Sequence, residues 1–210
     1  MSDVKVPVLI VGGGASGLMT SIMLSSYAID HILIERHEGT SILPKAHYLN
    51  QRAMELFRQF EVADDIYALG TPTEKMASVV WQTTLAGDGP LQRKTFHKMD
   101  CFGGGALTER YLRDSACPST NLPQLRLEPI MRQHAEKRAP GRVLFNHELT
   151  RMTQDDTAVT ATVLNRATGE TFTVTADYLV GADGGKTVGP MIGATMVGAG
   201  CASNQRRAAH

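Results

Sequence analysis

A glycine-rich turn between a predicted strand and a predicted helix is the feature that most constrains the fold of this chain. Residues 6–11 form a β-branched apolar run, typical of a buried strand in a parallel sheet, and helical periodicity extends from residue 15 to about residue 27. Residues 12–17 read Gly-Gly-Gly-Ala-Ser-Gly, which matches the dinucleotide-binding pattern G-x-G-x-x-G in the context that this pattern requires. Gly12 permits a tight turn, Gly14 lets the backbone approach a pyrophosphate, and Gly17 allows the helix to pack closely on the strand.

The N-terminus of this helix, with Ala15 and Ser16 in its first turn, is therefore predicted to face a pyrophosphate. Glu35 supports this interpretation, because it ends a second predicted strand at residues 32–34, eighteen residues after Gly17. A carboxylate there can accept hydrogen bonds from both ribose hydroxyls of an adenine dinucleotide. We place Arg36 in the same cofactor-binding set. Strand, helix and strand form a predicted βαβ unit with a right-handed crossover, but the glycines alone do not distinguish FAD from NAD.

The composition excludes several classes of function. The 210 residues are 42% hydrophobic, as in an ordinary soluble domain, and Lys plus Arg and Asp plus Glu both count 21. Without net charge or a basic stripe, no nucleic-acid partner is expected. The run at 6–11 is too short to span a bilayer and no basic stretch precedes it, so we expect a cytoplasmic protein without a signal peptide or a membrane partner. The three cysteines are widely separated and predict neither disulfides nor a metal site.

The rest of the chain reads as further α/β structure. Helices are predicted at 51–60 and 127–139, and strands at 76–85, 93–99, 142–145, 158–164, 171–174 and 177–182. Turn residues between the first two of these strands, and between 164 and 171, predict two hairpins. Residues 101–123 are rich in Gly and Pro and receive no assignment. We therefore predict an α/β fold: a Rossmann-like βαβ domain with a mainly parallel sheet, plus the beginning of a mixed or antiparallel second sheet.

A second motif lies at residues 178–185, which read Tyr-Leu-Val-Gly-Ala-Asp-Gly-Gly. Here a buried strand leads into a turn in which glycines flank a carboxylate. Together with the first glycine turn and Glu35, this segment resembles the class A flavoprotein monooxygenases, the aromatic hydroxylases related to p-hydroxybenzoate hydroxylase, and especially their phenol and chlorophenol hydroxylase branch. The resemblance implies that Asp183 and Gly184 contact FAD and the nicotinamide cofactor, and it favours FAD over NAD as the resident dinucleotide.

Two intervening segments extend the resemblance. Residues 44–52 are similar to a family segment that usually has arginine where this chain has Lys45, before Ala46. Lysine keeps a positive charge for a phosphate or a flavin edge but lacks the planar fork of arginine, and a solvated loop lysine is the alternative. Residues 121–128 are similar to the segment whose glutamine touches the flavin side. This similarity places Gln124 at a helix start, where helix capping is the alternative role.

His47 is the predicted catalytic residue. In phenol-hydroxylase-like members this loop passes close to the substrate, so the resemblance implies that His47 orients or deprotonates a phenol. A solvated loop histidine is the alternative. Surface or packing roles, rather than metal binding, are expected for the histidines without ligand-like spacing, which are His31, His97, His134, His147 and His210.

The resemblance also implies a reaction. Members of the family reduce bound FAD with NADPH or NADH and react it with O2 to a flavin C4a-hydroperoxide, which hydroxylates a small phenolic substrate. The cofactor carries this chemistry, while the protein supplies orientation, water exclusion and polarisation of the phenol. A homodimer is a candidate assembly for full-length members. A nicotinamide-only dehydrogenase is disfavoured by the second motif.

The resemblance stops at about residue 198, although family members continue well beyond it. We expect a C-terminally truncated member with an incomplete FAD-binding domain at 1–197: the βαβ unit at 4–36, an excursion toward the substrate domain at about 73–120, and a return at about 121–190. Residues 198–210 are small, polar and basic and are expected to be disordered. Two hypotheses follow, an FAD-dependent aromatic monooxygenase and a catalytically inactive fragment that binds FAD or its ADP half.

Overall fold

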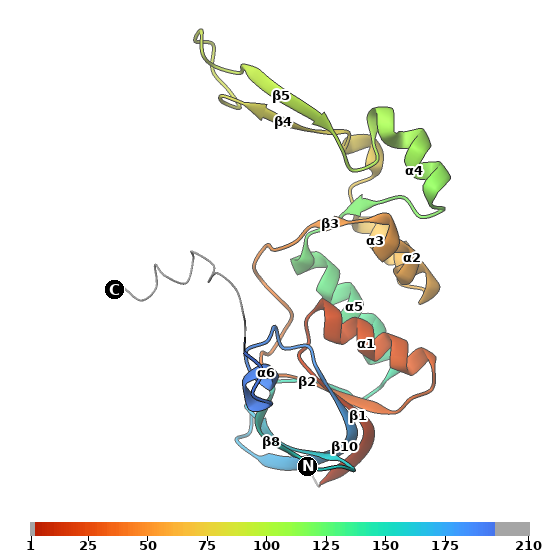
Figure 1. Ribbon diagram of the computed structural model, residues 1–210, viewed down its shortest axis with the longest axis vertical. Coiled ribbons are helices and arrows are strands. Elements are labelled where there is room, and N and C mark those ends of the chain that lie inside the picture. The colour runs from red at the N-terminus through yellow and green to blue at the C-terminus, as the bar shows by residue number, and fades with distance from the viewer. Residues whose placement is uncertain (1–2, 196–210) are drawn as a thin grey trace.

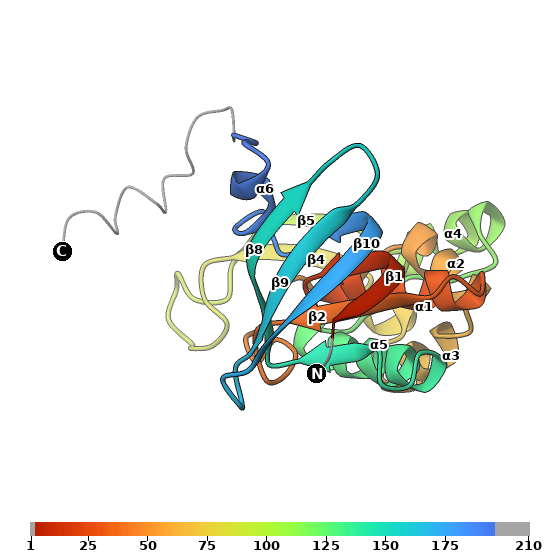
Figure 2. The same ribbon diagram turned by 90° about the horizontal axis from the view of Figure 1, so that it is seen from below.

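The computed structural model describes residues 3–195, and its centre is a six-stranded sheet (Figures 1 and 2). In spatial order the strands are β7 (Val143–Phe145), β2 (His31–Glu35), β1 (Val4–Val11), β10 (Thr171–Gly181), β9 (Val159–Asn165) and β8 (His147–Gln154). The pairs β7–β2, β2–β1 and β1–β10 are parallel, whereas β10–β9 and β9–β8 are antiparallel. The mainly parallel sheet confirms the predicted α/β class.

The predicted N-terminal βαβ unit is present. β1 leads into α1 (Ala15–Ser26), which returns the chain to β2, so that β2 lies parallel to β1 with Leu9 opposite Ile32. β1 begins at Val4, two residues before the predicted start, because Val4 and Lys5 already pair with β10. The carboxyl ends of β1, β2 and β10 consequently meet at one edge of the sheet, where ligands of open parallel sheets bind.

Both faces of the central strands are buried, as the unbroken apolar run of β1 predicts. On one face, Ile10 packs with Leu18 of α1 and with Met131 of α5 (Gln124–Arg138). On the other face, Leu9 packs with Ala161 of β9 in a second core cluster. Burying each large apolar side chain contributes about 1.5 to 3 kcal/mol, so this double-sided core forms a stable base for the turns at the sheet edge.

The prediction of two separate strands in the region of β10 is wrong. The pattern predicts separate strands at 171–174 and 177–182, but Thr171–Gly181 is a single strand whose first part pairs with β9 and whose second part pairs with β1. The two predicted pieces join because Phe172, Val174 and Ala176 are buried in one continuous alternation. β8 was not predicted, since it is largely polar and has a bulge between Leu149 and Arg151, which interrupts the alternation.

In Figure 1, a second group of helices and short strands lies on the side of α5 that faces away from the central sheet. α2 (Gln51–Gln59) begins where predicted, and the Asn50 side chain caps it by accepting from the Ala53 N–H at 2.9 Å. α5 begins three residues earlier than predicted. The remaining elements lie at positions without a prediction, including the unassigned segment 101–123: β3 (Tyr48–Leu49), α3 (Ala63–Leu69), η1 (Thr73–Lys75), η2 (Gly105–Leu107), α4 (Thr108–Asp114), β6 (Thr120–Asn121) and α6 (Val188–Met191).

The predicted hairpin of the middle segment is confirmed. β4 (Ser78–Gln82) and β5 (Thr95–Asp100) pair antiparallel, and both strands are shorter than predicted. Figure 1 shows this hairpin extending away from the central sheet, on the far side of α3. The predicted disorder of residues 198–210 concerns residues that the structure does not describe. Within residues 3–195, no helix combines the length and the apolarity that a membrane crossing requires.

Candidate functional site

The turn between β1 and α1 packs tightly against the end of β10. Gly12 adopts φ +115°, a conformation that favours glycine, and its N–H donates to the Ile34 carbonyl at 2.8 Å. A Cβ on Gly12 would overlap the Ala182 carbonyl oxygen, and a Cβ on Gly17 would overlap the Gly12 carbonyl oxygen. Packing within the protein therefore requires glycine at both positions.

Gly14 differs, because no contact among residues 3–195 requires a glycine there. Its backbone is extended, with φ −77° and ψ −177°, and the atom nearest to an added Cβ would be Glu128 Oε1 at 3.7 Å. Gly14 is the N-cap residue of α1, has no side-chain cap, and is followed by a first turn without acidic residues. The N–H groups of that turn have no intrahelical acceptor, and the helix dipole favours negative charge beside them. The open space and the uncapped helix end together fit a phosphate group.

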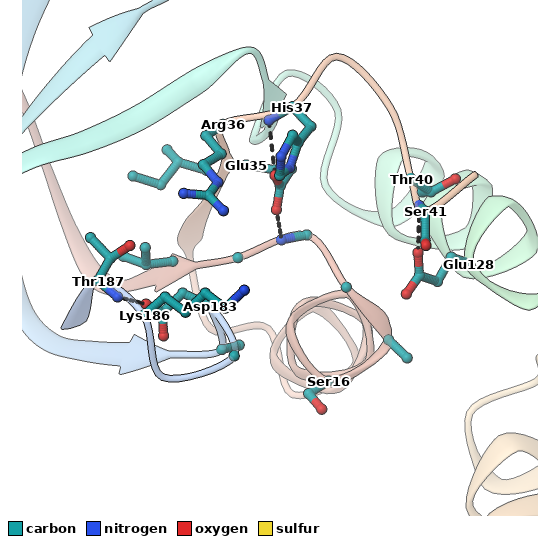
Figure 3. A pocket seen from close by; sticks show the side chains of 18 of the residues that line it. Ser16, Glu35, Arg36, His37, Thr40, Ser41, Glu128, Asp183, Lys186 and Thr187 are labelled. Carbon is teal, nitrogen blue, oxygen red and sulfur yellow. Dashed lines mark hydrogen bonds and ion pairs between the residues drawn. The ribbon is translucent and has the colours of Figure 1, made fainter. Parts of the chain in front are cut away.

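Glu35 ends β2 directly beside this turn. Its Oε2 accepts from the Gly13 N–H at 2.7 Å, and its Oε1 accepts from the His37 N–H at 2.9 Å and lies 2.6 Å from His37 Nδ1. Figure 3 shows the carboxylate between the turn and the imidazole. A Cβ on Gly13 would come within 2.7 Å of Glu35 Cβ, so the absence of a side chain there lets the carboxylate lie against the turn.

A cleft of about 1110 Å³ lies over the turn and collects most of the predicted cofactor residues (Figure 3). Its walls come from the β1–α1 turn, the segment after β2, the start of α5 and the turn after β10. The predicted residues that line it are Gly12, Gly14, Ala15, Ser16, Glu35, Arg36, Lys45, Gln124, Asp183 and Gly184. Gly17, Ala46 and His47 are outside this lining. The cleft is at least as large as the clefts that hold drug-sized ligands, so a dinucleotide can be accommodated.

The turn after β10 uses its carboxylate within the protein. Asp183 Oδ1 accepts from the Gly185 N–H at 3.1 Å, and Oδ2 accepts from the N–H groups of Thr187 and Val188. Burial by itself would raise the pKa of Asp183, but the three backbone donors outweigh burial and lower it. The side chain for which the resemblance implies a cofactor contact therefore closes its own turn, while the turn as a whole lines the cleft.

The segment with Lys45 and Ala46 is attached to the start of α5. The Gln124 N–H donates to the Ala46 carbonyl at 2.9 Å. Gln124 is the first residue of α5, but it is not a cap: the N-cap residue is Pro123, which makes no side-chain cap hydrogen bond. The side-chain amide of Gln124 instead donates to Glu128 Oε1, which leaves its oxygen to accept from a ligand in the cleft.

His47 lies on the same segment but outside the cleft lining. Its exposed ring places Nδ1 3.1 Å from Asn121 Oδ1, and its carbonyl accepts from the Leu122 N–H at 2.8 Å. Because an amide oxygen only accepts, His47 carries a proton on Nδ1 in this contact. The catalytic role of His47 stays a prediction. In the described part of the chain, no three His, Cys, Asp or Glu side chains are grouped to hold a metal ion.

Among the cleft residues outside the predicted set, Glu128 and His37 make contacts that shape the site. Glu128 is only 2% exposed, and its Oε2 accepts from the Ser41 N–H at 2.8 Å, which links the segment after β2 to α5. The available sequence signal was a glutamate on an apolar helix face, between Leu127 and Ile130. His37 carried no comparable signal, because its role depends on the orientation of the Glu35 side chain.

The chain is similar to known proteins over most of its length. Residues 5–205 match the protein family described as FAD binding domain. Phenol 2-monooxygenase from Pseudomonas sp. (strain EST1001) is 36% identical over 197 residues, which cover 92% of this chain and 31% of that protein. The 2,4-dichlorophenol 6-monooxygenase from Delftia acidovorans is 33% identical over 183 residues, covering 86% of this chain and 30% of that protein.

The chain is also similar to a solved structure of a flavin-dependent monooxygenase. The flavin-dependent monooxygenase PieE, in complex with FAD and substrate, superposes with a TM-score of 0.85 and 37% identity over 95% of this chain and 34% of that chain. The chain thus spans about a third of the length of these relatives. The predicted resemblance to flavoprotein aromatic hydroxylases is confirmed, and the chain belongs to the FAD binding domain family of the flavin-dependent monooxygenases.

Proposed function

We propose that the chain forms the FAD-binding part of an aromatic monooxygenase that uses NADPH or NADH, together with O2, to hydroxylate a phenolic ring. The observation that carries this proposal is the open space at Gly14, where the uncapped N-terminus of α1 meets the fixed carboxylate of Glu35. The family match supports FAD as the cofactor. The names of the phenol and dichlorophenol monooxygenases support the reaction class.

The ADP half of FAD would be held by the βαβ unit. The N–H groups of Ala15 and Ser16 and the space at Gly14 would receive the diphosphate, because a helix N-terminus favours anions. Glu35 would accept hydrogen bonds from the ribose hydroxyls. Arg36 lines the same part of the cleft and extends over it in Figure 3, where it would contact the adenosine end.

The flavin half would be held by residues from three segments. Lys45 supplies a positive charge, the side-chain oxygen of Gln124 supplies an acceptor, and the turn of Asp183 and Gly184 completes the wall. Bound FAD supplies the redox and oxygen-transfer chemistry. The contribution of these residues is to bind and orient the cofactor and to exclude water from it.

His47 is proposed to orient or deprotonate the phenol. Its Nδ1 holds the proton shared with Asn121 Oδ1, so Nε2 of the neutral ring is the atom that would accept the phenolic proton. Histidine ordinarily titrates near neutral pH, which suits a general base. The hydrogen bond from the Leu122 N–H to the His47 carbonyl anchors the loop to the segment before α5.

The segment at 73–120 is proposed to lead toward a substrate domain. β5 is exposed along its whole length, and the apolar side chains of Leu91 and Phe96 are 72% and 69% exposed. Exposed apolar side chains on a protruding hairpin fit a surface that packs against further protein, which the longer relatives would supply. A cytoplasmic location and, for the full-length protein, a homodimer are further parts of this proposal.

The visible spectrum of the purified chain, measured after incubation with FAD and removal of excess cofactor, tests the FAD assignment. The matched variant is Gly14→Val, because its Cβ has room within the protein and its branched side chain would fill the phosphate space. We expect at least about a tenfold loss of FAD affinity, since one or more hydrogen bonds to a charged group are lost, while the circular dichroism spectrum of the folded protein is retained. Gly189→Ala in α6, where an added Cβ meets no atom within 4 Å, is the control and should bind FAD like the wild type.

Oxidation of NADPH that is stimulated by phenols, together with detection of the hydroxylated product, tests the reaction. A chain that takes up FAD but shows no phenol-stimulated turnover would support the alternative of a binding fragment. A folded chain that stays colourless at high FAD concentration would contradict the proposal itself. Equal FAD affinity of Gly14→Val and the wild type would contradict the assignment of the phosphate position.

A further inference from the structure

We propose that the imidazole of His37 competes with the ribose for the carboxylate of Glu35, and thereby sets the affinity of the site and its pH dependence. This inference rests on the proposed function, because it assumes that Glu35 receives ribose hydroxyls. In Figure 3 the ring of His37 lies directly against this carboxylate, at the edge of the cleft. His37 would then be a positioning residue that acts on the ligand through Glu35.

The argument starts from the number of hydrogen bonds that Glu35 can accept. A carboxylate has about four lone-pair sites, two on each oxygen. Oε1 already receives two donors, the backbone N–H and the Nδ1–H of His37, and Oε2 receives the Gly13 N–H. One site remains, on Oε2. Two ribose hydroxyls need two sites, so one of the three protein donors has to leave.

The imidazole is the donor that can leave. The Gly13 N–H belongs to the tightly packed β1–α1 turn. The backbone of His37 is held from the other side, because its carbonyl accepts from the Asn146 N–H at 2.9 Å. The His37 side chain, in contrast, is 62% exposed and turns away by rotation about its own side-chain bonds. The ribose therefore displaces the ring and leaves the backbone contacts in place.

Competition of this kind depends on pH. A protonated imidazole forms a charge-assisted pair with the carboxylate and holds it more strongly than a neutral ring does. The affinity should therefore fall as the pH drops and the ring of His37 takes up its second proton. The charged or titratable groups around His37 are Glu35, Arg36 and Glu38 on its own segment, Arg132 of α5, Glu148 of β8, Arg166 after β9, and across the cleft Lys45, Glu128, His147, Asp183 and Lys186.

His147 is the other histidine in this set, so the test has to separate the two rings. The affinities of the full chain for FAD, by quenching of flavin fluorescence, and for ADP, by calorimetry, are measured from about pH 5.5 to about pH 8.5. His37→Ala should bind ADP about three- to tenfold more tightly than the wild type at the acidic end, because a competing hydrogen bond is removed. 2′,3′-Dideoxy-ADP, which lacks the hydroxyls, should bind the two proteins equally.

Two further variants serve as controls. His37→Asn keeps a side-chain donor near the position of Nδ1 but does not titrate, so its FAD affinity should lose the dependence on pH while staying near the wild-type value at high pH. FAD is the ligand for this comparison, because its diphosphate, unlike the terminal phosphate of ADP, has no ionisation in this pH range. His97→Ala removes an exposed histidine of β5, whose ring lies tilted against Trp81 in the hairpin, and should leave the affinities for ADP and FAD unchanged.

The possible outcomes separate the two proposals. If the wild type binds neither ADP nor FAD, the proposed function fails and this inference fails with it. If the wild type binds ADP but His37→Ala binds it equally or more weakly, only the competition is overturned, because His37 would then support Glu35. Retention of the full pH dependence in His37→Asn would also overturn the inference, because a group other than His37 would then cause that dependence.

Discussion

Two glycine-containing turns border the cleft, and they use their backbone N–H groups in opposite ways. In the turn between β1 and α1, Glu35 accepts the N–H of Gly13, and the first turn of α1 has neither a side-chain cap nor an acid. In the turn after β10, Asp183 accepts the N–H groups of Gly185, Thr187 and Val188. The first turn of α1 leaves its N–H groups open toward the cleft, whereas the turn after β10 satisfies its donors internally.

This difference separates a turn that has room for a ligand from a turn that supports it. The second turn braces the first: the Ala182 N–H donates to the Val11 carbonyl at 2.8 Å, and the Ala182 carbonyl closes the space beside Gly12. A carboxylate flanked by glycines does not by itself indicate a cofactor contact, because the same pattern forms a self-capped turn. The second motif therefore fixes the shape of the first, and we propose that this is its main contribution to binding.

The largest expected effect is that of Gly12→Ala. The added Cβ would overlap the Ala182 carbonyl, and alanine at φ +115° is strained, so we expect the free energy of unfolding to fall by about 3 kcal/mol or more. Urea unfolding followed by circular dichroism measures this change. Gly189→Ala, which meets no atom, should stay within about 0.5 kcal/mol of the wild type. A Gly12→Ala protein as stable as this control would show that β10 does not brace the turn.

The first turn could be predicted from the sequence because its determinants are local. A buried strand, three glycines at fixed spacing and a helix are adjacent in the chain, and Glu35 follows at the end of the next strand. Each of these elements forms for reasons that neighbouring residues supply. The position of the site at the sheet edge then follows from the parallel pairing of β1 and β2.

The parts that could not be predicted depend on contacts between distant residues. Glu128 meets the N–H of Ser41, 87 positions away in the chain, and no periodicity encodes that contact. His47 is positioned by the pairing of β3 with β6, which puts its ring against Asn121, outside the cleft lining. The resemblance predicts a role for this segment, but it does not specify the direction of each side chain. β8 was missed for a related reason, since its burial comes from packing rather than from its own polar sequence.

Asp183→Asn should have an intermediate effect. An amide oxygen cannot replace both carboxylate oxygens as acceptors of three N–H groups, so we expect a loss of about 1 to 2 kcal/mol at neutral pH. The folded protein lowers the pKa of Asp183, which means that its contribution is fully present above the ordinary aspartate pKa and is lost as the pH falls through the folded value. The difference in unfolding free energy between Asp183→Asn and the wild type should therefore shrink below about pH 4.

Unfolding free energies of the two proteins at a series of pH values check this prediction. Asp177→Asn is the matched control, because Asp177 is an exposed aspartate of β10 and its substitution should leave stability nearly unchanged at every pH. FAD affinity supplies a second readout. If Asp183 acts only by closing its turn, loss of affinity should follow loss of stability. If Asp183→Asn instead lost FAD affinity without losing stability, this result would support a direct contact between Asp183 and the cofactor.

The smallest expected effect is that of Gly184→Ala, and it sharpens the contrast with Gly12. Both glycines have positive φ, but an added Cβ on Gly184, at φ +71°, meets no atom within 4 Å. Backbone strain alone should cost about 1 kcal/mol, and Gly184→Asn should cost less, because asparagine tolerates the left-handed region better than alanine. Melting curves of Gly12→Ala, Gly184→Ala and Gly184→Asn rank the costs in stability. If Gly184→Ala were as damaging as Gly12→Ala, strain rather than close packing would explain both glycines, and the second turn could not be said to brace the first.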